Sequence, residues 1–300
     1  MRNKERTGRT GRTIRTVRTS AFCASCAFFA LVPPLAAQSW RTVTSARQLH
    51  GERELNVTIQ YGVGRFRLGP ASSSQLYRME LRYDEDRFIP VREYSAAAHS
   101  ITLGVRGREG TRVSIRDTRR SEQTPSMDVA LTPDVPLVLE MNLGAVEAAV
   151  ELGGLAVRRA TYRTGASESR LHWSAPNPVA CEELRMEAGA AEFTASGLGN
   201  SNCAALRFDG GLGEITLDFN GSWRNSMDAS VNMGIGSLQL RLPRNVGVAV
   251  TVSRFLASFD GAGFTKRGNT YYSPNYNESR QRLTLHISTS IGGIEVAWID

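Results

Sequence analysis

The segment Cys181-Glu-Glu-Leu-Arg-Met-Glu-Ala-Gly-Ala-Ala-Glu-Phe-Thr194 decides the fold, because the chain repeats it almost at once. It aligns without a gap on Cys203-Ala-Ala-Leu-Arg-Phe-Asp-Gly-Gly-Leu-Gly-Glu-Ile-Thr216, at an offset of 22 residues. The Cys, Leu, Arg, Gly, Glu and Thr positions are identical in the two copies. Adjacent copies of one short pattern indicate stacked structural repeats.

The same pattern recurs at other places in the chain, each time in phase with a small residue. Successive steps between these residues are 21, 24, 22 and 23 residues, followed by one step of 56. Fixed periods of this size are typical of solenoid-like architectures, in which each repeat contacts only its neighbours. The small residues that mark the phase are Gly144, Gly165, Gly189, Gly211, Gly234 and Ser290.

Within each repeat, apolar and polar residues alternate on both sides of the small residue. Ile215, Leu217 and Phe219, for example, are separated by single polar residues. A period of two predicts a strand with one buried and one solvated face. Each repeat is therefore expected to form a strand, a glycine bend and a second strand. The sequence predicts an all-β fold, a solenoid-like stack of short strands; an antiparallel β-sandwich is the alternative.

Cys181 and Cys203 occupy the same position in neighbouring repeats, eight residues before Gly189 and Gly211. Paired strands lie about 4.8 Å apart, and a disulfide needs Cα atoms roughly 4.4–6.8 Å apart. The spacing predicts a disulfide between the two residues, which should stabilise the fold by about 3 kcal/mol. Two buried free thiols are the alternative.

Residues 1–37 are typical of a secretory signal peptide. Basic residues precede an apolar run over 21–32, and two prolines then lead to a cleavage site predicted between Ala37 and Gln38. An uncleaved anchor is the alternative. We expect an extracytoplasmic bacterial protein, periplasmic or secreted, without a membrane span after cleavage. The basic residues are Arg2, Lys4, Arg6, Arg9, Arg12, Arg15 and Arg18.

Most of the net charge of the chain belongs to this leader. Without its seven basic residues and one acid, the chain keeps 36 − 7 = 29 basic and 29 − 1 = 28 acidic residues, a net charge of +1. The basic isoelectric point therefore gives no support to a nucleic-acid partner.

The remaining 263 residues are expected to form two β units, over residues 38–125 and 126–300. The step of 56 residues is interpreted as an insertion that begins with a buried strand at Val246–Val252. The insertion continues through a glycine-rich aromatic segment, which is expected either to bind a partner or to cap the end of the stack. The aromatic residues of that segment are Phe264, Tyr271, Tyr272 and Tyr276.

No catalytic, cofactor-binding or metal-binding motif emerges from the sequence. Gly62-Val-Gly64 is followed by strand residues and not by the helix that a phosphate loop requires. His172 and His286 are predicted to face solvent by alternation. Glutamates three residues past successive glycines are interpreted as a repeated solvated position.

Several segments resemble the C-terminal β domain of LiaF-related proteins, among them Thr164-Gly-Ala-Ser-Glu168 and Trp173-Ser-Ala-Pro-Asn-Pro178. Tyr61-Gly-Val-Gly64 and Tyr83–Pro90 resemble the toast-rack domain of the same group. The resemblance implies a bacterial cell-envelope protein, since the name-giving members modulate a sensor kinase that responds to cell-wall antibiotics. Those members carry several membrane helices before the β domain, whereas this chain has an export signal.

The sequence as a whole predicts an exported, non-enzymatic β-rack protein that acts as a binding or scaffold module. A role of this module in the envelope-stress response is a further hypothesis. An envelope protein or a cell-wall polymer is the expected partner. The alternatives are a secreted carbohydrate-active enzyme on a β-helix and an adhesin that binds glycans through the loop at Tyr271–Tyr276.

Overall fold

A computed structural model describes residues 39–72, 74–109 and 124–300. The predicted signal peptide and its cleavage site at Ala37 and Gln38 lie outside these residues. Gln38–Asp300 form one compact unit. Among the described residues, no helix is both long and apolar enough to span a membrane.

Strands dominate this unit, and a single 3₁₀ turn at Leu198–Asn200 is the helical element found in the described ranges. The strands are β1 (Trp40–Gln48), β2 (Leu55–Pro70), β3 (Gln75–Asp84), β4 (Phe88–Ser95), β5 (Ser100–Gly107), β6 (Ser126–Leu131), β7 (Leu137–Glu151), β8 (Val157–His172), β9 (Cys181–Ser196), β10 (Cys203–Asp218), β11 (Met227–Pro243), β12 (Gly247–Phe259), β13 (Thr265–Arg267), β14 (Thr270–Tyr272) and β15 (Arg282–Ile299).

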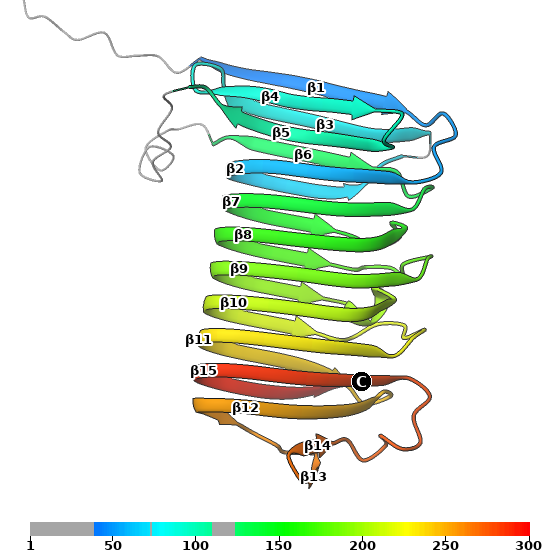
Figure 1. Cartoon of the computed structure of the whole chain (residues 1–300), viewed down its shortest axis with the longest axis vertical. Coiled ribbons are helices and arrows are strands. Elements are labelled where there is room, and N and C mark those ends of the chain that lie inside the picture. Colours follow the sequence, from blue (N-terminus) through cyan, green and yellow to red (C-terminus); the bar gives the residue numbers. More distant parts are fainter. Residues whose placement is uncertain (1–38, 73, 110–123) are drawn as a thin grey trace, which may run out of the picture. The chain divides into compact units, whose positions relative to one another are not determined.

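The long strands form a continuous parallel ladder, whose rungs are stacked along the long axis of the view in Figure 1. Its order is β2-β7-β8-β9-β10-β11-β15-β12, and every neighbouring pair in it is parallel. Antiparallel pairs occur in the described sheet at its two ends. The predicted all-β stack is confirmed, and the antiparallel sandwich is not the arrangement that forms.

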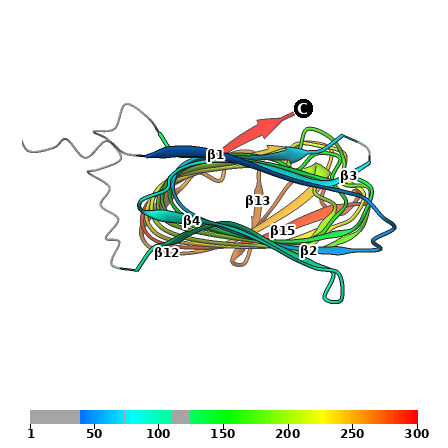
Figure 2. The same ribbon diagram turned by 90° about the horizontal axis from the view of Figure 1, so that it is seen from above.

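Each long strand is one rung of the stack and bends at its central small residue. In β9, Leu184, Met186 and Ala188 are buried before the bend, and Ala191 and Phe193 are buried after it. The buried positions therefore shift by one residue across the exposed bend. This shift keeps apolar side chains inside both layers of the rung, and the rungs superpose as a flattened ring when viewed along the stack (Figure 2).

Aromatic and aliphatic side chains from both layers fill the space inside the rungs. Tyr162, Phe193 and Phe208 are fully buried there. The ring centroids of Tyr162 and Phe193 lie 5.8 Å apart, and those of Phe193 and Phe208 lie 5.2 Å apart. Burying one such side chain stabilises the folded state by about 1.5–3 kcal/mol, so the repeated apolar positions supply the main driving force for stacking.

The small residues that share a phase in the sequence lie side by side in adjacent rungs of the structure. We call this row the glycine column. Flanking residues pair in register on every rung, as Gly210↔Ala188 and Leu212↔Ala190 show on either side of Gly211 and Gly189. A Cβ added to Gly211 would lie 2.5 Å from the carbonyl oxygen of Gly189. Close backbone approach at this bend therefore favours glycine at position 211.

The step of 56 residues has a different explanation from the insertion predicted above. The predicted strand at Val246–Val252 exists, but β12 continues to Phe259 and forms a full rung. The last strand of the chain, β15, lies between β11 and β12 and pairs with both in parallel. Ser290 consequently takes the place in the glycine column that follows Gly234, as its phase predicts.

At the opposite end, two short strands share one side of β2. β5 pairs with Asn56–Gln60 and β6 pairs with Arg65–Pro70. β3 and β1 then extend the sheet beyond β6 in antiparallel fashion. The division into units at residue 125 stays a prediction. β6, which follows that position in the sequence, pairs with β2 and β3, which precede it, so one sheet contains strands from both predicted units.

Candidate functional site

The predicted disulfide is present between Cys181 and Cys203, which pair in register at the starts of β9 and β10. Their Cα atoms are 4.1 Å apart, and both residues are buried. The bridge joins two adjacent rungs, so it fixes their register and closes a loop of 22 residues.

The aromatic segment predicted as a binding loop or a cap packs mainly against itself and the last rungs. Phe264 lies 4.8 Å from Trp298 between ring centroids, and Phe259 lies 4.9 Å from Tyr271. The indole nitrogen of Trp298 also donates a hydrogen bond to the carbonyl oxygen of Ala262, at 3.2 Å. Phe264 and Tyr271 therefore belong to a partly buried aromatic cluster that packs against the last rungs.

Tyr272 and Tyr276 form a separate pair, with ring centroids 4.9 Å apart. Each ring also faces a guanidinium group, that of Arg267 for Tyr272 and that of Arg282 for Tyr276. Such cation–π contacts hold the two rings in place at half-exposed positions. Partner binding by these two residues stays a prediction.

Side chains that were predicted to face solvent do so. His172 and His286 are exposed. The glutamates three residues past the glycines stand in register, as shown by Glu168↔Glu192 and Glu192↔Glu214. No cluster of histidine, cysteine and acidic residues suited to a metal ion occurs among the described residues.

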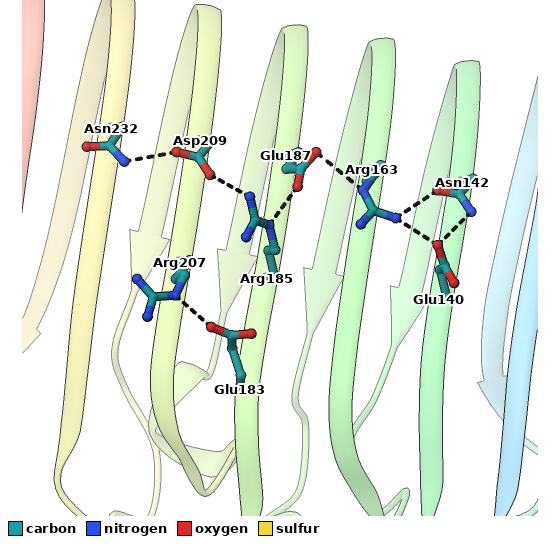
Figure 3. Close-up of polar contacts among 9 residues, drawn as sticks. All are labelled: Glu140, Asn142, Arg163, Glu183, Arg185, Glu187, Arg207, Asp209 and Asn232. Carbon is teal, nitrogen blue, oxygen red and sulfur yellow. Dashed lines mark hydrogen bonds and ion pairs between the residues drawn. The ribbon is translucent and has the colours of Figure 1, made fainter.

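In each rung, the strand half before the bend forms the first layer and the half after the bend forms the second layer. The outer surface of the first layer carries a set of charged and amide side chains that extends over five rungs, from β7 to β11 (Figure 3). We call this set the polar ladder. Its members occupy outward positions two, four or six residues before the glycine column. They are Glu140, Asn142, Arg163, Glu183, Arg185, Glu187, Arg207, Asp209 and Asn232.

Hydrogen bonds and ion pairs connect most of the polar ladder into one chain. Arg163 donates to Glu140 at 2.8 Å and reaches Glu187 at 3.3 Å. Arg185 donates to Glu187 at 2.6 Å and lies 3.6 Å from Asp209. Arg163 and Arg185 therefore each bridge two acids through charge-assisted contacts.

The ends and flank of the ladder are completed by amides and one further pair. Asn142 accepts a hydrogen bond from Arg163 at 3.2 Å, and Asn232 donates to Asp209 at 2.9 Å. Arg207 donates to Glu183 at 2.6 Å, alongside the main chain of contacts. These side chains remain about half exposed, so each pair stabilises the fold by only about 0–1 kcal/mol.

The electrostatics of the ladder favour the charged form of Arg185. The hydrogen bond to the Glu187 carboxylate raises the pKa of the Arg185 guanidinium above its ordinary value, and the charges of Glu187 and Asp209 act in the same direction. Three arginines face four acids, so the net charge of the ladder is 3 − 4 = −1. The surface therefore offers many hydrogen-bonding groups with almost no net charge.

A shallow groove of about 550 Å³ runs along the ladder. It is lined by Asn142, Leu143, Arg163, Thr164, Arg185, Glu187, Ala188, Gly189 and Asp209. Its rigid strands and small bend residues make this the best candidate binding surface among the described residues. The groups present can hydrogen-bond a polar ligand.

Sequence reasoning missed the polar ladder, and it also missed the asparagine in Pro176-Asn-Pro178. Asn177 is buried and donates to the carbonyl oxygens of Val157 and Ser201, at 2.7 and 2.9 Å. It accepts from the amides of Val157 and Val179, both at 3.2 Å. The sequence signal that could have identified Asn177 is its position as an isolated polar residue in a turn between two repeats. Buried asparagine in a turn commonly satisfies backbone groups in this way.

Comparison with known proteins identifies a family and several structures of low similarity. The family described as the N-terminal domain of toast_rack, DUF2154, matches residues 37–179 and 179–241. No curated protein matches the chain.

Three solved structures resemble the chain over most of their lengths. A candidate cell adhesion protein from Clostridium sporogenes ATCC 15579 is 16% identical, with 87% of this chain and 100% of that chain covered and a TM-score of 0.48. A candidate adhesin from Bacteroides fragilis NCTC 9343 is 11% identical, with coverage of 86% and 97% and a TM-score of 0.38. A candidate lipid-binding protein from Parabacteroides distasonis ATCC 8503 is 10% identical, with coverage of 86% and 96% and a TM-score of 0.35.

Proposed function

Because the chain belongs to the toast-rack family defined by that N-terminal domain, we propose that it is a non-enzymatic binding module of the bacterial cell envelope. The polar ladder is its ligand-binding surface. The observation that carries the proposal is the continuous contact chain from Glu140 to Asn232, which displays fixed donors and acceptors along a groove.

The chemistry of the ladder favours a neutral polar ligand. Arginine, asparagine and carboxylate side chains hydrogen-bond to hydroxyl and amide groups without a strong preference for either sign of charge. A net charge of −1 would attract neither a polyanion nor a strongly cationic partner. We therefore favour a cell-wall polymer that carries hydroxyl and amide groups over a charged envelope protein.

Two features support a compartment outside the cytoplasm. Disulfides persist mainly in oxidising, extracytoplasmic compartments, and Cys181 and Cys203 form one. The segment over residues 1–37 has the composition of an export signal. Both agree with a periplasmic or secreted protein.

The resemblance to LiaF-related proteins adds a finer hypothesis, in which occupancy of the ladder reports envelope stress to a membrane partner. The alternative of a carbohydrate-active enzyme receives no support from the ladder. A glycosidase needs two carboxylates that are free to act as acid and as base or nucleophile, and every acid of the ladder is already engaged by an arginine. A glycan-binding loop at Tyr271–Tyr276 is also less favoured, because Tyr271 packs in the cap.

Removing the arginines of the ladder is expected to weaken binding to insoluble cell-wall material. The double variant Arg163→Gln and Arg185→Gln loses the two groups that bridge neighbouring rungs. Co-sedimentation of the purified chain with washed bacterial walls measures the affinity. We expect at least a tenfold loss, which corresponds to about 1.4 kcal/mol.

The matched control is Arg67→Gln with Arg170→Gln, because both arginines are exposed in the second layer and form ion pairs there. The control should bind like the natural chain, and circular dichroism should show both variants folded. Equal binding by all three proteins would contradict the proposal. Release of soluble sugar from the walls would instead favour the enzyme.

A further inference from the structure

Five large hydrophobic side chains are exposed in the described part of the chain. All of them lie at the bends of the last four rungs, in the glycine column or one residue past it. The exposed fractions range from 44% for Ile291 to 81% for Phe255. Register places four of them side by side, one residue past the glycine column. We call the set the apolar ridge: Leu212, Ile235, Ile291, Leu256 and Phe255.

The ridge is specific to this end of the stack. In the same column, the middle rungs carry alanine at Ala145, Ala166 and Ala190; Ala190 pairs with Leu212 on one side and with Ala166 on the other. Two of these alanines line a groove of about 560 Å³. A contiguous apolar strip on a secreted protein marks an interaction site more often than a solvated surface.

On β11, β15 and β12, the column two positions beyond the ridge carries no charged residue. Two positions beyond the ridge, Glu192 and Glu214 give way to Ser237, Gly293 and Ser258 as the stack passes from β10 to β11, β15 and β12. Depletion of charge around exposed apolar residues is the compositional mark of the core of a protein interface. It is unlike the basic border of a membrane-binding surface.

The ridge ends at a sheet edge with unpaired backbone N–H and C=O groups. β12 pairs with β15 along its length, from Gly247 to Phe259. On its other side, β14 pairs only with Ala249–Thr251. Within the described ranges no backbone hydrogen bond joins the outer edge of residues 252–259 to another segment. Unpaired N–H and C=O groups of this kind are a template for a further strand.

The interior behind this open edge is incompletely covered. Phe259, Phe264 and Trp298 pack together but remain only partly buried, whereas the aromatic residues of the middle rungs are fully buried. At the opposite end of the stack, β1 presents an outer strand rich in arginine, threonine and serine. Such polar edges resist strand addition.

We propose that the outer edge of β12 from residue 252 to 259 is a strand-addition site, which accepts an extended, mostly apolar segment of a partner protein as the next rung. The segment pairs with the β12 backbone and sets its own apolar side chain beside Leu256. Arg254 is the one charged residue in this stretch. An acidic residue in the partner segment complements it.

A second copy of the chain fits this edge poorly. The ridge contributes five side chains, whereas a stable interface needs about 800 Å² from each partner. The β13–β14 hairpin also pairs beyond the first half of β12, at the end where a second stack would have to abut (Figure 1). An extended segment needs only the free half of the strand.

A synthetic peptide with the sequence of Ile287–Ala297 serves as the probe, because this part of β15 already pairs with the inner edge of β12. Its large apolar residues are Ile287, Ile291, Ile294 and Val296, and it carries one acid, Glu295. Hydrogen exchange of the full chain is followed as peptide is added. We expect protection of the amides of residues 252–259 that rises with peptide concentration. A peptide with proline in place of Ile291 should not protect them.

Phe255→Lys with Leu256→Lys is expected to weaken the peptide affinity at least about tenfold, because charged side chains on an edge oppose pairing. The control, Ala166→Lys with Ala190→Lys, places the same charges in the same column between paired rungs and should bind normally. No protection of the natural chain at any peptide concentration would overturn the proposal. So would protection that depends only on protein concentration, with dimers in sedimentation equilibrium, since a second copy would then occupy the edge.

The strand-addition site is independent of the polar ladder. The Arg163→Gln and Arg185→Gln variant should therefore bind the peptide like the natural chain, and the Phe255→Lys and Leu256→Lys variant should still bind cell walls. Failure of one proposal is thus distinguishable from failure of the other.

Discussion

Replacing Cys181 and Cys203 together by alanine is expected to lower the free energy of unfolding by about 3 kcal/mol. The bridge closes a loop of 22 residues between two adjacent rungs, so its loss enlarges the conformational freedom of the unfolded chain. Both residues are buried, and alanine fits their positions without introducing a polar group. The loss is a large fraction of the free energy of unfolding of an ordinary domain, which is about 5–15 kcal/mol.

Denaturant titration of the variant and of the natural chain measures this loss. Reductant should destabilise the natural chain by a similar amount and leave the variant unchanged, which separates the bridge from the packing of the two side chains. An unchanged midpoint for both comparisons would show that the two sulfurs are not joined.

Gly236→Ala is expected to cost about 4 kcal/mol, because two effects add at this position. Gly236 has a φ of +142°, in a region that residues with a Cβ rarely adopt. An added Cβ would also lie within 3.0 Å of the carbonyl oxygen of Gly213, which belongs to the rigid neighbouring rung. The rung cannot move away without disturbing its own ladder.

Gly62→Ala is the matched control, since Gly62 lies at the bend of β2 and an added Cβ would meet nothing within 4 Å. Its stability should change by less than about 1 kcal/mol. Thermal or denaturant unfolding of the two variants measures the difference. Similar stabilities for both would contradict the close approach of rungs at the bend.

The repeat pattern allowed much of the fold to be predicted. Alternation around Gly189 and Gly211 predicted strands with a bend, and the shared phase of Cys181 and Cys203 predicted their contact. These features depend on local periodicity and on the equivalence of neighbouring repeats. Both can be read from spacing alone, because strand neighbours in a parallel ladder must share a register.

The order of the last rungs could not be predicted in the same way. Periodicity shows that Ser290 occupies the glycine phase, but it does not show which rung precedes it in space. The placement of β15 between β11 and β12 depends on tertiary packing, which buries the apolar face of β15 before its bend. Leu283, Leu285 and Ile287 are fully buried there.

The polar ladder was missed for a related reason. Outward residues are not constrained by the core, so Arg163, Glu187 and Asp209 share a column without sharing a residue type. Their interaction emerges only when the rungs are placed side by side. Sequence alternation identified these positions as exposed, and the register of the strands determines which of them meet.

The most direct test of the in-register stack with its inserted C-terminal strand is disulfide cross-linking of the variant Gln239→Cys with Glu295→Cys. These residues pair between β11 and β15, and paired strands bring Cα atoms within the range that a disulfide requires. Mild oxidation followed by peptide mapping should find the cross-link in high yield. Ser237→Cys with Ser258→Cys, which lie two rungs apart, should remain unlinked. A cross-link between residues 237 and 258, with none between 239 and 295, would contradict the account, because β12 would then follow β11 directly.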